Sequence, residues 1–133
     1  MTPSIPRGPL RLSAAASVLM LLAGAALANP TSVASTPVGE VLTDAATGMT
    51  LYTFQKDSRG MSACTGQCAV AWPPFVGAQG ARADDGSTLI KRPDGSLQWA
   101  TAAGMPLYFW QGDKKPGDTS GDGVNGVWDA ARK

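Results

Sequence analysis

Two ten-residue segments of the chain are nearly the same. Residues 48–57 read GMTLYTFQKD and residues 104–113 read GMPLYFWQGD, with six identities in ten positions. At the same spacing, residues 39–72 align with residues 95–128 without a gap, and nine of the 34 positions are identical. A unit this small cannot bury a core alone, so we expect two related halves that pack on each other.

The residues in and around each copy favour β-strands. The runs EVLT (40–43) and TLYTF (50–54) are rich in β-branched and aromatic residues, with Gly48 at the turn, and they predict a β-hairpin. In the second half, PDG (93–95) is a turn signal between two strand-like runs. The segment GQCAVAW (66–72), followed by two prolines, predicts one or two helical turns. The expected fold is mainly β: a small antiparallel β domain made of two related hairpin-containing repeats, with one short helical segment near the Cys pair.

The start of the chain has the pattern of a secretory signal peptide. Two arginines precede an apolar run from Ala14 to Ala28, which ends in an A-x-A cleavage pattern. We therefore expect residues 1–28 to be cleaved after Ala28, which leaves no stable membrane span. Position 29 is Asn, so the mature chain has no Cys to lipidate there, and the predicted location is periplasmic or secreted.

Composition divides the remaining chain into an arm and a domain. The stretch NPTSVASTP is rich in Pro, Ser and Thr, and it predicts a flexible N-terminal arm over 29–38. A single β-rich domain is expected over 39–133, with repeat one at 39–75 and repeat two at 94–129.

The composition excludes several classes of function. The chain has no histidine, which removes Ser-His-Asp and Cys-His catalysis and His-ligated zinc or copper. Outside the signal peptide, 9 of the 11 basic residues stand against 10 acidic residues, so nothing indicates a nucleic-acid partner. We expect no cofactor, and the partner is an unknown ligand or envelope protein.

Cys64 and Cys68 are the two cysteines of an exported chain, so a structural disulfide is expected. A redox or copper(I) role is the alternative, because thiolates and thioethers suit copper(I) and Met61 lies three residues before Cys64. Arg59 is the nearest cation in the sequence that could activate a thiol.

The aromatic residues of each copy fall on one face of a strand, because side chains alternate along it. Their main interpretation is core packing, with each Tyr hydroxyl reaching a polar partner; an aromatic platform for a ligand is the alternative. The aspartate of each copy is expected to accept backbone N–H bonds in the turn after the strand, and a carboxylate pair of an enzyme is the alternative. The repeat motif consists of Tyr52, Phe54 and Asp57 in the first copy and Tyr108, Trp110 and Asp113 in the second.

The segment DTSGDGVNGVWD (118–129) partly imitates a calcium loop, with Asp118, Asp122 and Asp129 at ligand positions. Asn125 stands where a calcium loop has a hydrophobic residue, and Asp129 is shorter than the usual Glu. An Asp/Gly turn loop is therefore the main interpretation, and a weak cation site is the alternative. We assign no firm metal site.

The segments YTFQKD (52–57) and YFWQGD (108–113) both fit Y-x-(F/W/Y)-x-x-D. Together with ACTGQCAVAWPPF (63–75) and GDTSGDGVNGVW (117–128), they make the chain resemble a bacterial secreted-repeat lipoprotein family of unknown function. The resemblance covers about 39–129 and implies tandem repeats and an exported location rather than an activity. Asn29 departs from the lipoprotein description, which calls for a lipidated Cys.

These observations predict an exported, non-catalytic envelope or secreted protein that acts by binding or interaction. The alternative is a periplasmic redox or copper(I)-handling protein that uses Cys64 and Cys68. A weaker alternative is a carboxylate-based enzyme with Asp57 and Asp113.

Overall fold

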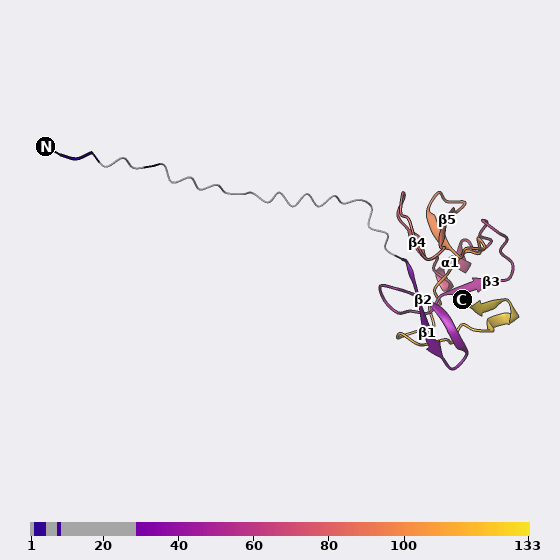
Figure 1. Ribbon diagram of the computed structural model, residues 1–133. Coiled ribbons are helices and arrows are strands. Elements are labelled where there is room, and N and C mark those ends of the chain that lie inside the picture. The colour runs from indigo at the N-terminus through magenta and orange to yellow at the C-terminus, as the bar shows by residue number, and fades with distance from the viewer. Residues whose placement is uncertain (1, 5–7, 9–28) are drawn as a thin grey trace.

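The computed structural model describes residues 2–4, 8 and 29–133, and Figure 1 shows the folded part at the end of the chain. Apart from residues 2–4 and 8, the predicted signal peptide and its cleavage site lie outside the described residues. Among the residues described, none of the helices has the length and apolar character that crossing a bilayer requires.

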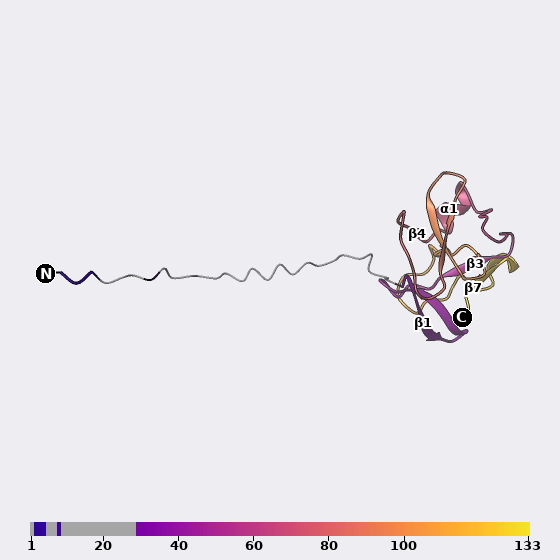
Figure 2. The same cartoon turned by 45° about the horizontal axis from the view of Figure 1, so that its top comes forward.

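The fold is mainly β, as predicted, with small antiparallel sheets and one short α-helix beside the cysteines. Its sheets are β1–β2, β3–β7 and β4–β6–β5. Figures 1 and 2 show the β1–β2 hairpin at one end of the folded part and β4 and β5 at the other, with β3 between them. The elements are β1 (Thr31–Thr36), β2 (Gly39–Asp44), β3 (Tyr52–Phe54), α1 (Gln67–Ala71), β4 (Val76–Gly77), β5 (Thr88–Lys91), β6 (Leu97–Ala100), the 3₁₀ turn η1 (Val124–Gly126) and β7 (Trp128–Ala130).

The segment expected to be a flexible arm forms strand β1 instead. Its residues pair in register with β2, from Thr31 opposite Asp44 to Thr36 opposite Gly39. The Thr31 hydroxyl also donates to an Asp85 oxygen at 2.7 Å. The prediction weighed the Ser/Thr/Pro composition and missed that Thr and Val are good strand residues once a partner strand follows at once.

The expected hairpin between residues 40 and 54 is present only in part. Gly48 has a φ of 76°, as its turn requires, and the Leu51 amide donates to the Leu42 carbonyl at 2.9 Å. Beyond Leu51, the chain leaves β2, and β3 pairs with β7 of the other repeat. The two repeats are therefore interlocked rather than stacked as separate units.

A pseudo-two-fold axis passes between Tyr52 and Tyr108. The Tyr52 amide donates to the Tyr108 carbonyl at 2.8 Å, and the Tyr108 amide donates to the Tyr52 carbonyl at 3.0 Å. Such a reciprocal pair is what equivalent residues of two antiparallel strands make. The sequence repeat is therefore also a structural repeat.

The alignment of the repeats contains one gap that the sequence comparison missed. The Leu51 amide bonds to the Leu42 carbonyl, whereas the equivalent Leu107 amide bonds to the Trp99 carbonyl. The turn before the motif is thus one residue shorter in the second repeat. The offset between the two decamers applies from Gly48 onward. It does not apply before this turn, so Gly39 and Gly95 are not at equivalent positions.

Four aromatic rings form a column through one half of the core. The Phe54 and Trp128 rings stack at 4.2 Å, Trp128 and Trp72 at 3.8 Å, and Trp72 and Trp110 meet at 4.1 Å. The Tyr52 ring meets Trp72 edge-on at 5.4 Å, and the Tyr108 ring meets Trp128 edge-on at 5.2 Å. Each contact has a counterpart in the other repeat, so the column follows the same two-fold axis.

The opposite face of the central strands covers a second apolar cluster. Leu51 and Leu107 are fully buried there, because they alternate with the tyrosines. Phe75, Trp99 and Ala131 complete the cluster.

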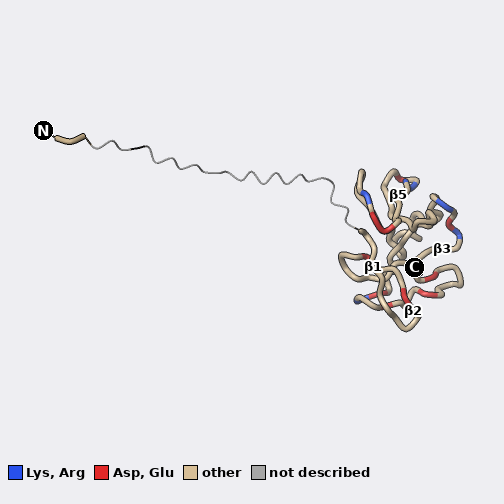
Figure 3. The backbone as a smooth tube through the Cα atoms, in the orientation of Figure 1, with Lys and Arg blue, Asp and Glu red and all other residues tan. Residues whose placement is uncertain are grey.

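Figure 3 shows Lys and Arg interspersed with Asp and Glu around the folded part.

We predict that Trp72→Ala destabilises the domain by about 3–5 kcal/mol, because its ring lies between two others at the centre of the column. Trp110→Ala should cost clearly less, because Trp110 lies at the end of the column and is half-buried. Urea denaturation of both variants measures this difference. Equal losses would contradict a column centred on the two-fold axis.

Candidate functional site

The tyrosine and aspartate of each motif bind partners in the other copy. The Tyr52 hydroxyl donates to Asp113 Oδ2 at 2.6 Å, and the Tyr108 hydroxyl donates to Asp57 Oδ2 at 2.7 Å. Both tyrosines are fully buried, and both aspartates are more than nine-tenths buried. The motif therefore forms two crossed hydrogen bonds across the two-fold axis.

The second oxygen of each carboxylate accepts from the loop that follows its own strand. Asp57 Oδ1 accepts the Ala63 amide at 2.6 Å. Asp113 Oδ1 accepts the Ser120 amide at 3.0 Å and the Ser120 hydroxyl at 2.6 Å. Each aspartate thus binds a backbone N–H, as expected, but six or seven residues away rather than inside the immediate turn.

Burial sets the protonation of this network. Burial raises the pKa of Tyr52 and of Tyr108 above the ordinary value, and the Asp hydrogen bonds add to this. Both hydroxyls therefore remain donors. Burial also raises the pKa of the Asp57 carboxyl, against the opposing effects of the Ala63 amide, the Tyr108 hydroxyl and the Arg92 charge.

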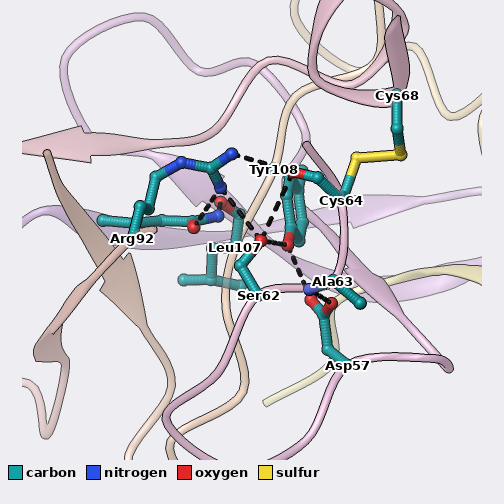
Figure 4. The surroundings of a disulfide bond; sticks show 9 residues. Asp57, Ser62, Ala63, Cys64, Cys68, Arg92, Leu107 and Tyr108 are labelled. Carbon is teal, nitrogen blue, oxygen red and sulfur yellow. Dashed lines mark hydrogen bonds between the residues drawn. A yellow bond between two sulfur atoms is a disulfide. The ribbon is translucent and has the colours of Figure 1, made fainter. Parts of the chain in front are cut away.

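Arg92 is a buried cation that sequence reasoning missed. Arg92 is only 5% exposed. Its guanidinium donates to the Ser62 hydroxyl at 3.0 Å, to Gln98 Oε1 at 2.8 Å and to the Cys64 carbonyl at 2.8 Å. Figure 4 shows the continuous chain of contacts from Arg92 through Ser62 to Tyr108 and Asp57. Arg92, not the sequence neighbour Arg59, is the cation bonded beside the disulfide.

The two cysteines form a disulfide, with their Cα atoms 5.2 Å apart. Cys64 is fully buried in the aromatic cluster, and α1 begins one residue before Cys68. Met61, the third candidate for a copper(I) site, is 67% exposed. The two cysteine sulfur atoms of the candidate set are bonded to each other.

The three aspartates of the candidate calcium loop each have a different partner. Asp118 Oδ2 accepts the Lys114 amide, Asp122 Oδ1 accepts the Ala130 amide, and Asp129 Oδ2 accepts the Gln55 side chain. Within residues 29–133 and the few others described, no group of three or more His, Cys, Asp or Glu side chains could hold a metal ion. Each carboxylate thus accepts a hydrogen bond from a protein group outside the loop.

A groove of about 680 Å³ opens on the side of the second apolar cluster. Its apolar lining includes Leu42, Met105, Leu107 and Ala131. The turn between β6 and the second motif forms one wall, and the segment after β7 forms another. Sequence reasoning did not identify this groove, because its residues come from distant segments and form no motif.

Polar side chains surround the apolar part of the groove. Asp85, Asp129, Arg132 and Lys133 all contribute to the lining. Asp85 is fixed by hydrogen bonds from Thr31 and Ser87, which outweigh its burial and lower the pKa of its carboxyl. Arg132 lies 3.7 Å from an Asp122 oxygen. Both signs of charge therefore border an apolar floor.

The crossed motif and the two-fold axis define a tandem-repeat domain whose halves complete each other. A family described as "secreted repeat of unknown function" matches the chain twice, at residues 32–76 and 88–132. The chain therefore belongs to this family. No curated protein and no solved structure matches the chain.

The two matches are longer than the repeats expected at 39–75 and 94–129. Each match starts early enough to include most or all of the strand before the expected start, β1 in one repeat and β5 in the other. One repeat therefore consists of a two-stranded hairpin, a motif strand, a loop and a tryptophan.

We predict that Asp57 makes the domain less stable as the pH rises. A carboxyl whose folded pKa lies above its unfolded value binds more protons when folded, so stability decreases as pH rises from about 3.9 through the raised value. The difference in unfolding free energy between wild type and Asp57→Asn should follow this trend, and urea titrations between pH 3 and 7 measure it. A difference that stays constant or grows in favour of wild type would contradict the raised pKa.

Proposed function

We propose that the protein is an exported, non-catalytic envelope or secreted domain that acts by binding, and that the groove is its binding site. The observation that supports this most is the groove itself. Its volume of about 680 Å³ lies within the usual range of about 300–1,000 Å³ for small-molecule sites. An apolar floor with a few polar groups at its border is also typical of such sites.

The state of the motif residues supports a non-catalytic role. Asp57 and Asp113 are each bonded to a buried tyrosine and to a loop amide. Among the described residues, every buried side-chain nitrogen and oxygen has a hydrogen-bond partner. Carboxylates held in this way act as structural acceptors, which is the opposite of the open geometry that an acid–base pair needs.

The export part of the proposal rests on the family and on the sequence before Asn29. The family is described as secreted. The basic residues, the apolar run and the A-x-A pattern support cleavage after Ala28, and Asn29 supports a mature chain that is not lipidated. The proposed location is therefore the periplasm or the cell exterior.

The groove is tested with an apolar probe that makes no assumption about the natural ligand. We expect trans-2-decalol to shift the ¹³C-methyl resonances of Leu42, Met105 and Ala131 in a saturable manner. Methyl groups outside the groove, such as those of exposed Val70 and Val76, serve as internal controls. Shifts spread equally over both sets, or none with any apolar probe, would contradict the proposed binding site.

The redox alternative is tested on the disulfide. We expect the Cys64–Cys68 bond to persist in a glutathione buffer at about −200 mV, because structural disulfides have potentials below about −300 mV. The double variant Cys64→Ser, Cys68→Ser should lose about 2 kcal/mol of stability and retain probe binding. Reversible reduction at the buffer potential, or a copper(I) affinity lost in the variant, would instead favour the redox role.

A further inference from the structure

The groove lies where equivalent residues of the two repeats differ in side-chain size. The Ala131 amide donates to the Leu51 carbonyl at 2.8 Å, and the Phe75 amide donates to the Leu107 carbonyl at 2.9 Å. Because Leu51 and Leu107 are equivalent motif residues, Ala131 in the groove is equivalent to Phe75 in the other half. One position therefore has a methyl group in one repeat and a phenyl ring in the other.

Two more pairs follow the same pattern. The Leu42 amide donates to the Ala131 carbonyl at 2.7 Å, and the Trp99 amide donates to the Phe75 carbonyl at 2.8 Å, so Leu42 is equivalent to Trp99. Thr53 and Phe109 hold the same place in the motif strand, directly after its tyrosine. Three residues that line the groove thus have aromatic counterparts across the two-fold axis.

In the other half, these aromatic residues fill the equivalent space. Phe75 and Trp99 are 8% and 7% exposed, and the Phe75 and Phe109 rings meet edge-on at 5.3 Å. A Cβ atom on Gly77 would lie 3.0 Å from the Trp99 indole nitrogen, so there is no free space beneath this ring. The groove is therefore the part of the pseudo-symmetric core from which three rings are missing.

We propose that the groove binds a small apolar molecule that contains an aromatic ring, and that this ring takes the place of the missing side chains. This inference rests on the proposed binding function and names the class of ligand. The Met105 thioether lines the groove and suits an aromatic ring, because sulfur–aromatic contacts are favourable. Lys133 supplies a cation at the border, which a ring face attracts and a saturated ring does not.

The test compares two probes with the same carbon skeleton, 2-naphthol and trans-2-decalol, by methyl NMR titration of the whole protein. We expect 2-naphthol to bind about tenfold more tightly than trans-2-decalol, because sulfur–aromatic and cation–π contacts of ordinary strength provide a gain of that size. Its shifts should centre on Leu42, Met105 and Ala131. Equal affinity of the two probes would overturn the aromatic preference and leave the proposed function standing, whereas binding of neither probe would overturn both.

Variants that restore the missing rings give a second, independent test. Ala131→Phe copies the counterpart residue Phe75 and should reduce 2-naphthol binding at least tenfold. Thr53→Phe copies Phe109, and its half-buried strand position makes it the alternative if Ala131→Phe fails to fold. Val76→Phe adds the same ring at a site 58% exposed and outside the groove, and should bind like wild type. Undiminished binding in a folded Ala131→Phe or Thr53→Phe would contradict the assignment.

Discussion

The structure depends on two hydrogen bonds that cross between its repeats. Each joins a fully buried tyrosine of one copy to an aspartate of the other, at 2.6 and 2.7 Å. A hydroxyl buried without a partner would cost about 1–3 kcal/mol, so each half of this small domain is incomplete without the other. The tyrosine backbones also bond to each other, and the tyrosine rings pack edge-on against the central tryptophans. One spacing of Tyr and Asp therefore fixes the sheet, the ring column and the loops that follow.

The two halves share this centre and differ around it. After the first motif, the chain forms a disulfide loop whose Cys64 carbonyl binds buried Arg92. The equivalent loop after the second motif has Ser120 and no cysteine. A second difference lies beside the second apolar cluster. Phe75, Trp99 and Phe109 fill the space on one side of the two-fold axis, and the groove takes the equivalent place on the other side. These positions can differ without changing the shared centre, and the proposed binding site, the groove, is one such difference.

The sequence predicted the part of the structure that is repeated. The recurring Gly, Tyr and Asp indicated two related β halves. The two cysteines of an exported chain indicated the disulfide, and residues 66–72 before two prolines indicated the short helix. Strand β1 was missed because its stability comes from pairing with β2 rather than from its Ser- and Thr-rich composition. The crossing of the motif bonds was also missed, because spacing along one chain does not show which copy a side chain faces. Arg92 gave no local signal, since it binds Cys64 from 28 residues away. The difference in size between Thr53 and Phe109 was visible in the aligned repeats, but only the fold shows that Thr53 lines a groove.

The central claim is that the Tyr and Asp of each motif act across the repeats. Double-mutant cycles test it most directly, because they measure the coupling of a pair apart from its separate effects. We expect Tyr52→Phe and Asp113→Ala to be coupled by about 1–3 kcal/mol, and Tyr108→Phe and Asp57→Ala to be coupled to a similar extent. The pairs within one motif, Tyr52 with Asp57 and Tyr108 with Asp113, should be additive within about 0.5 kcal/mol. Strong coupling within a motif and additivity across motifs would contradict the crossed arrangement.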